Sequence, residues 1–197
     1  MEITAAMVKD LRAQTNAGVL DCRKALEKAE GDMAKAAELL REKGLAQAAK
    51  KADRVTKEGM IGHYIHTGSK VAAIVEVNCE SDFVARTEQF QTLIRELAMQ
   101  VVAARPTYVK VEDIPAELLE DLKGQFQLTI EGSKTPEQVE KIMTGKLAKY
   151  FEENVLLEQP YIKDESVKVK DLVTAVIAKL GENVQVPLKE YYPDLPD

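Results

Sequence analysis

Apolar residues recur at helical spacing through the first 44 residues of the chain. Thr4 can cap a first helix, which an Asn-Ala-Gly turn ends, and Gly31 can end a second helix. Asp32 can cap a third helix, which runs towards Gly44. The inward-facing apolar positions of the three runs are Met7, Val8, Leu11, Leu20, Ala25, Leu26, Ala29, Met33, Ala36, Leu39 and Leu40. This spacing predicts a three-helix module over residues 1–44.

The period of the pattern changes after this module. Residues 45–58 are rich in Ala and Lys and have only a thin apolar face, which predicts an exposed linker helix. From Gly59 the apolar positions alternate, and a glycine-containing loop at residues 67–69 separates two alternating runs. Such a pattern is typical of an antiparallel β-hairpin.

Helical spacing returns in the rest of the chain. The expected helices cover an amphipathic run at about 84–104, then 115–131, 136–155 and 171–180. Residues 183–192 suit a strand interrupted at Pro187, which should therefore lie at an edge or a bulge. The predicted fold class is α+β, in which the three-helix module is followed by a core domain over 59–197. This core is a three-stranded antiparallel sheet packed with helices.

Composition and charge narrow the function. The 197 residues are 45% hydrophobic and 30% charged, which is enough to bury a core. The net charge of −6 argues against direct nucleic-acid binding, because such binding depends on neutralising phosphates. Cys22 and Cys79 are too few for a disulfide framework and lack the spacing of a zinc site. No apolar run reaches the ~18 residues that span a membrane, so we expect a cytoplasmic protein without membrane contact.

Two segments carry a family resemblance. Residues 11–26 read LRAQTNAGVLDCRKAL, and residues 76–86 read EVNCESDFVAR. Both resemble signatures of the elongation factor Ts family, and the likeness continues over about residues 3–183. The chain departs from the usual pattern at Asn16, where glycine is usual and a left-handed turn tolerates Asn. It also departs at the Val-Leu pair that follows this turn and at the serine of the second segment.

The resemblance implies a guanine nucleotide exchange factor, not an enzyme, that acts on elongation factor Tu in its GDP-bound and nucleotide-free forms. It implies no catalytic residue, metal or cofactor. In the family a Thr-Asp-Phe-Val tetrapeptide disturbs magnesium binding on elongation factor Tu. By position that role falls on Ser81, Asp82, Phe83 and Val84. The family's N-terminal module is similar to ubiquitin-associated domains and docks on the GTPase, and the matched contact candidates are Arg12, Val19 and Leu20.

The length of the chain adds an expectation about assembly. Short members that resemble this chain pair as homodimers, so the resemblance implies a dimer that binds two GTPase molecules in a 2:2 complex. The dimer interface should join sheet to sheet, because this would cover an otherwise exposed apolar face. The core domain is then also a dimerisation domain.

Spacing alone leaves other interpretations open. Phe83 lies seven residues before Phe90, which would place it in the buried stripe of the long amphipathic run. Asp82 is equally well explained as a helix cap. His63 and His66 are three positions apart on a predicted strand, so they point to opposite faces and do not readily share a metal ion.

Two other classes of function remain beside the exchange factor. The main alternative is a helical protein-binding adaptor module, similar to ubiquitin-associated domains, on an unrelated dimerisation domain. A hydrolase or transferase is third, because the sequence has no nucleophile elbow and no phosphate-binding glycine loop. Binding to elongation factor Tu separates the first two classes.

Overall fold

The structure is a computed structural model that describes residues 3–15, 17–130 and 135–187. The chain divides into two compact units. Unit 1 comprises the residues up to His63 together with Ile74–Glu96 and Lys170–Val186, and unit 2 comprises Tyr64–Ala73 and Leu97–Val169. Both helices and antiparallel strands are present, so the predicted α+β class is confirmed.

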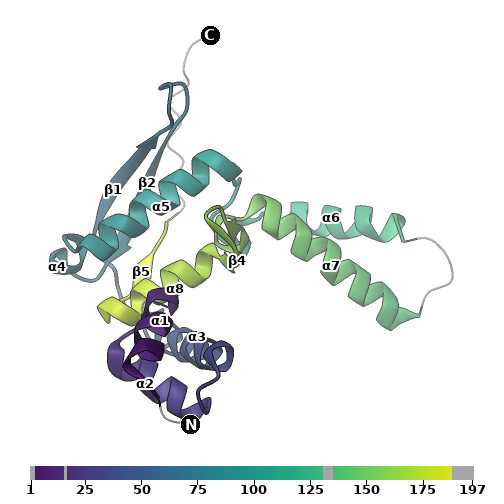
Figure 1. Ribbon diagram of the computed structural model, residues 1–197. Coiled ribbons are helices and arrows are strands. Elements are labelled where there is room, and N and C mark those ends of the chain that lie inside the picture. The colour runs from purple at the N-terminus through teal and green to yellow at the C-terminus, as the bar shows by residue number, and fades with distance from the viewer. Residues whose placement is uncertain (1–2, 16, 131–134, 188–197) are drawn as a thin grey trace. The chain divides into compact units, whose positions relative to one another are not determined.

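Three helices form the N-terminal part of unit 1 (Figure 1): α1 (Ala5–Thr15), α2 (Val19–Lys28) and α3 (Met33–Ala49). Both predicted caps are present. The Oγ1 of Thr4 accepts a hydrogen bond from the Met7 N–H at 3.3 Å. The Oδ1 of Asp32 accepts from the N–H groups of Ala34 at 2.9 Å and Lys35 at 3.0 Å. These side chains satisfy donors that the first turn of a helix leaves free.

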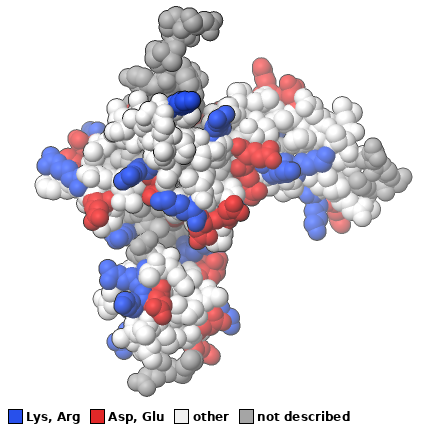
Figure 2. Space-filling view, turned by 45° about the horizontal axis from the view of Figure 1, so that its top comes forward, with Lys and Arg blue, Asp and Glu red and all other residues white. Residues whose placement is uncertain are grey.

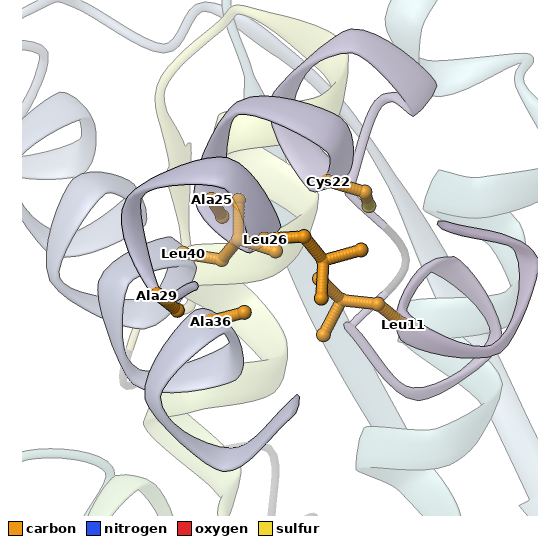
Figure 3. Close-up of a cluster of buried hydrophobic side chains, with 7 residues drawn as sticks. All are labelled: Leu11, Cys22, Ala25, Leu26, Ala29, Ala36 and Leu40. Carbon is orange, nitrogen blue, oxygen red and sulfur yellow. The ribbon is translucent and has the colours of Figure 1, made fainter. Parts of the chain in front are cut away.

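Small apolar side chains fill the centre of this three-helix module (Figure 3). The buried set is Leu11, Cys22, Ala25, Leu26, Ala29, Ala36 and Leu40. Three of the seven are alanines, which let the helix backbones approach closely. The predicted three-helix module is therefore confirmed, and α2 contributes three of the seven buried residues, Cys22, Ala25 and Leu26.

The sequence suggested that the third helix ends near Gly44, but the structure shows that it continues. Helix α3 continues to Ala49, and a Cβ placed on Gly44 would lie 3.5 Å from the Thr174 Cγ2 and 3.9 Å from the Ala178 Cβ of α8 (Val169–Leu180). The glycine therefore serves the packing of α3 against α8, not a helix end. Because α3 takes the first five residues of the segment 45–58 and turns follow, that segment is no separate linker helix. The domain boundaries at 44 and 58 stay predictions.

The sheet has the strand order β1-β2-β5. Strands β1 (Glu58–Ile65) and β2 (Ala72–Cys79) form the predicted hairpin, and the His66 N–H donates to the Val71 carbonyl at 2.9 Å across its loop. Strand β5 (Val184–Gln185) pairs antiparallel with β2. It is shorter than the predicted strand 183–192, whose residues 188–192 lie outside the described residues.

Two helices replace the single amphipathic helix expected at 84–104. They are the one-turn helix α4 (Asp82–Ala85) and the long helix α5 (Glu88–Ala104), which lies along the hairpin in Figure 1. The approach of α5 to β1 is close at Gly62, where an added Cβ would collide with the side chain of Ile94. Helix α5 buries Phe90 and Leu97 completely, and Phe90 is the largest of the fully buried side chains among the described residues.

Unit 2 contains a pair of helices and a small hairpin. Helices α6 (Ala116–Leu128) and α7 (Pro136–Asn154) lie side by side in Figure 1, and Thr135 caps α7 as its sequence predicts. The remaining elements are the 3₁₀ turns η1 (Val111–Asp113) and η2 (Leu156–Glu158) and the strands β3 (Pro160–Tyr161) and β4 (Asp164–Lys168). The sequence pattern did not predict the β3–β4 hairpin.

Two buried amides hold this hairpin in place. Gln100 and Gln159 are each 1% exposed, and the Gln100 Nε2 donates to the Gln159 Oε1 at 3.1 Å. The Gln100 Oε1 accepts from the Ile162 N–H at 3.0 Å, and its Nε2 also donates to the Pro160 carbonyl at 3.1 Å. A two-residue strand has little ladder of its own, so these side chains supply the bonds that fix it.

Candidate functional site

The candidate site is the corner between the end of β2 and the start of α4. Ser81 is the N-cap of α4, and its Oγ accepts a hydrogen bond from the Val84 N–H at 3.4 Å. Asp82 is the first helical residue and accepts from the Arg86 Nη2 at 2.7 Å. The alternative in which Asp82 caps the helix is therefore wrong, because the hydroxyl one residue earlier takes that role.

Phe83 points away from the core. Its side chain is 79% exposed, whereas the next residue, Val84, is 8% exposed. The interpretation that spacing places Phe83 in the buried stripe is wrong, because α4 ends at Ala85 and the chain turns before α5 begins at Glu88. The seven-residue spacing to Phe90 does not run along one helix, so Val84 takes the inward position instead.

The corner is bonded to the turn that follows α8. The Ser81 N–H donates to the Glu182 Oε2 at 3.0 Å, and the Ser81 hydroxyl donates to the Glu182 Oε1 at 2.6 Å. Asn183, which is 2% exposed, donates its backbone N–H to the Glu80 Oε1 at 2.6 Å. Nothing in the spacing or composition of the sequence singles out Glu182 or Asn183. They become visible only when two segments about a hundred positions apart meet.

Burial also affects Cys79, the last residue of β2. Its thiol is fully buried and donates to the Ser81 carbonyl at 3.1 Å. Burial, reinforced by the negative charge of Glu182, raises the pKa of the Cys79 thiol above its ordinary value. The cysteine is therefore a neutral, packed part of the corner and not a reactive thiolate.

The other predicted contact residues lie in the three-helix module. Arg12 is exposed on α1. Val19 and Leu20 begin α2 and are 51% and 72% exposed, so two neighbouring apolar side chains face solvent there. The corner and the start of α2 are thus two of the segments at which unit 1 exposes large apolar side chains. The adjacent pair Val19 and Leu20 is a candidate contact surface, because contiguous exposed apolar side chains are a feature of protein-binding surfaces.

The outer face of the hairpin carries three exposed isoleucines. Ile61 and Ile65 alternate along β1 with Gly62, which faces α5, and they are 65% and 55% exposed. Ile74 on β2 is 71% exposed and alternates with the buried Val75. Period-two alternation places these three isoleucines on the face away from α5.

Metal-ligand clusters and the distribution of charge bear on other kinds of site in the part of the chain that the structure describes. No three His, Cys, Asp or Glu side chains gather as metal ligands among these residues. His63 is exposed, and the His66 Nδ1 lies 3.2 Å from the Tyr64 hydroxyl. On the face drawn in Figure 2, basic and acidic side chains are interspersed and form no single basic stripe. None of the described helices is both long and apolar enough to cross a membrane.

The fold and the corner define an α+β protein with exposed apolar residues, including a phenylalanine held at the tip of a strand-to-helix turn. Comparison with known proteins gives the family. The model of the family described as Elongation factor TS matches residues 2–190, and the chain belongs to this family. Members of the family act as guanine nucleotide exchange factors for elongation factor Tu in translation elongation, and this is the function of the chain.

Several relatives are similar over nearly the whole chain. The elongation factor Ts of Thermodesulfovibrio yellowstonii is 52% identical over 186 residues, which cover 94% of this chain and 93% of the relative. That of Carboxydothermus hydrogenoformans is 51% identical and covers 93% of this chain and 85% of the relative. That of Thermotoga maritima is 52% identical and covers 94% and 93%.

Proposed function

We propose that this exchange factor releases GDP by pressing the corner Ser81–Val84 against the magnesium and phosphate site of elongation factor Tu. The observation that carries the proposal is the 79% exposure of Phe83 beside the 8% exposure of Val84. A large apolar side chain is thereby offered to a partner, while its neighbour anchors the turn in the core. In this proposal Ser81 caps the turn, Asp82 and Phe83 make the contact, and Val84 acts through its anchoring.

The nucleotide site of a GTPase is sensitive to such a contact. It holds GDP through a phosphate-binding loop, a helix N-terminus and a magnesium ion that demands near-ideal octahedral geometry. A small displacement of this shell is therefore costly. Phe83 entering an apolar crevice beside the site would contribute about 1.5–3 kcal/mol if fully buried. The carboxylate of Asp82 would accept hydrogen bonds from donors that the displaced phosphate leaves.

Nucleotide exchange then follows from reciprocal linkage. If the factor weakens GDP binding, GDP weakens binding of the factor by the same free energy. A nucleotide that rebinds, in practice abundant GTP, then expels the factor. No bond is made or broken in this cycle, so the protein acts without enzymatic chemistry and without a cofactor.

The three-helix module supplies a second contact in this proposal. Arg12, Val19 and Leu20 are exposed, as a docking surface requires. Two exposed apolar side chains with a basic residue suit a partner surface that is apolar at its centre and acidic at its rim. Docking through this module would hold the factor on the GTPase while the corner acts on the nucleotide site.

The protein also works as a homodimer in this proposal, in a 2:2 complex with elongation factor Tu. Support comes from the outer face of the β1–β2 hairpin, where Ile61, Ile65 and Ile74 are between 55% and 71% exposed. Packing two such faces together would remove six isoleucines from water. Sedimentation that gives a monomer at micromolar concentration would exclude this assembly.

The site of action is the cytoplasm, where translation elongation takes place, and the partner is a protein and not a membrane or a nucleic acid. The net charge of −6 supports the absence of nucleic-acid binding. A helical adaptor module on a dimerisation domain is the competing function. It predicts binding to some other peptide and no effect on nucleotide release.

The decisive test is release of a fluorescent GDP analogue from cognate elongation factor Tu, followed by stopped flow with increasing amounts of the factor. We expect release to accelerate and to saturate. Asp82→Ala should reduce the saturating rate while Asp53→Ala, an exposed acid in the turns after α3, leaves it unchanged. No acceleration by the folded parent would refute the proposal, and equal effects of the two variants would refute the role of Asp82.

A further inference from the structure

We propose that Glu182 is a positioning residue for the exchange reaction: its carboxylate fixes the corner that presents Phe83. This inference rests on the role proposed above for Phe83. Glu182 does not itself touch the partner in this proposal, but acts through Ser81. The geometry that points to it is a pair of hydrogen bonds from one residue of the corner to one carboxylate.

The two bonds define both the backbone and the side chain of Ser81. Its N–H donates to the Glu182 Oε2 at 3.0 Å, and its hydroxyl donates to the Oε1 at 2.6 Å. Because the hydroxyl hydrogen is used in this way, a lone pair of the same oxygen is free to accept from the Val84 N–H at 3.4 Å. Bonds to an ionised acceptor are stronger than neutral ones. Glu182 therefore orients the cap of α4 as well as the chain that enters it.

The corner needs such an external bond because α4 is only one turn long. A four-residue helix fixes several dihedral angles for very few internal bonds and has little stability of its own. Phe83 lies in the middle of this turn and makes no core contact that would hold it, since it is 79% exposed. Its position is set by Val84 on one side and by Ser81 on the other.

Glu182 is itself held by its neighbour. Asn183 is 2% exposed, and its Nδ2 donates to the carbonyls of Ala52 at 3.2 Å and Arg54 at 2.9 Å. Its backbone N–H donates to the Glu80 Oε1 at 2.6 Å. The two acids thus make reciprocal hydrogen bonds. Glu80 accepts from the N–H of Asn183, the residue after Glu182, and Glu182 accepts from the N–H of Ser81, the residue after Glu80. Moving this turn would leave buried polar groups without hydrogen-bond partners, so the turn is a rigid support.

This arrangement separates positioning from docking. Without Glu182, Phe83 keeps its exposure and can still meet the partner, but the corner samples more orientations and fewer of them fit. Loss of preorganisation of this kind reduces the maximal rate of GDP release roughly three- to tenfold, because the ordering of the corner must then occur in the complex. The concentration of factor that gives half the maximal rate should change less than twofold, because the exposed residues of the three-helix module are untouched.

The test uses the full chain with cognate elongation factor Tu and measures the maximal rate and the half-saturating concentration of nucleotide release separately. The variants are Glu182→Ala, Glu182→Gln, Ser81→Ala and the double variant Ser81→Ala/Glu182→Ala. Glu182→Gln keeps one acceptor oxygen and should lie between the parent and Glu182→Ala. The matched control is Glu88→Ala, which removes an exposed acid from the first turn of α5. The effect of Glu182→Ala should be smaller in the Ser81→Ala background than in the parent.

Backbone amide hydrogen exchange by NMR provides a readout that does not depend on the partner. In Glu182→Ala the Ser81 amide should exchange at least several-fold faster, while amides in the centre of α5 stay as in the parent. An unchanged Ser81 amide, or a maximal rate equal to that of the parent, overturns the proposal. So does an effect on the half-saturating concentration alone.

If the parent fails to accelerate release, the proposed role of Phe83 is refuted, and amide exchange then shows by itself whether Glu182 holds the corner. Circular dichroism verifies folding, and if Glu182→Ala does not fold, Glu182→Gln is decided by the same two readouts.

Discussion

The change that most directly examines the exposed corner is Phe83→Ala. Complete burial of a phenylalanine contributes about 1.5–3 kcal/mol. Phe83 exposes 79% of its side chain, so at most this fraction of its surface can still be buried on the partner. Burying that fraction would contribute about 1.2–2.4 kcal/mol to binding. If this energy is realised when GDP leaves, kcat/KM for nucleotide release falls roughly 8- to 60-fold, since each 1.36 kcal/mol corresponds to a factor of ten.

The same substitution should leave the folded chain almost unaffected. An exposed side chain that is truncated changes the free energy of unfolding by less than about 0.5 kcal/mol. Phe90→Ala provides the contrast, because Phe90 is fully buried and its loss should cost about 3–5 kcal/mol. Leu128→Ala, at a residue that is 86% exposed in unit 2, controls for the loss of an exposed apolar side chain as such.

Stopped-flow release of a fluorescent GDP analogue gives kcat/KM, and urea unfolding gives stability. Phe83→Ala with the kcat/KM of the parent would refute the proposal that Phe83 enters a crevice beside the nucleotide site. A loss of stability like that of Phe90→Ala would refute the outward orientation of Phe83. Equal losses of activity in Phe83→Ala and Leu128→Ala would show that any exposed apolar residue has this effect, and the corner would lose its special role.

Three further changes address the packing, the assembly and the pH dependence. Gly44→Ala should raise the free energy of unfolding by about 0.5–1 kcal/mol, because the new methyl group makes ordinary contacts with α8 and alanine favours a helix interior; a lower urea midpoint would contradict this. Ile74→Glu should convert the dimer into a monomer in sedimentation velocity, because it places a charge on the outer face of the hairpin, and a persistent dimer would exclude that interface. The hydroxyl and N–H of Ser166 hold the pKa of Asp164 below its ordinary value, so this carboxylate stabilises the chain above its unfolded pKa and the contribution is lost as pH falls through the folded pKa. Ser166→Ala should therefore raise the Asp164 pKa in a carbon-13 NMR titration, and an unshifted titration would contradict the assignment.

Sequence periodicity was sufficient for most helices and for their caps. Thr4, Asp32 and Thr135 each precede a run with clear helical spacing, and each accepts the expected backbone N–H. Gly44 was misinterpreted because a glycine near the end of a periodic run is more often a terminator than a packing contact. The partner that explains it, Thr174, lies 130 positions further along the chain.

The corner could be predicted only in part. The family resemblance located residues 81–84, whereas spacing alone placed Phe83 in the core. Periodicity failed there because it assumes one continuous helix, and the break between α4 and α5 has no glycine or proline to mark it. The β3–β4 hairpin was missed because its stability comes from the amides of Gln100 and Gln159 and not from an alternating pattern. Bonds between distant segments leave no periodic signal.

The close approach of α5 to the sheet restricts how this sequence can vary. Any amino acid other than glycine at position 62 brings a Cβ into the side chain of Ile94. The two positions therefore form a coupled pair, in which a side chain at 62 becomes acceptable only together with a smaller residue at 94. Libraries randomised at both positions should return glycine with large partners and alanine or serine only with truncated ones. The contact thus links the permitted substitutions of a strand to those of a helix some thirty residues away.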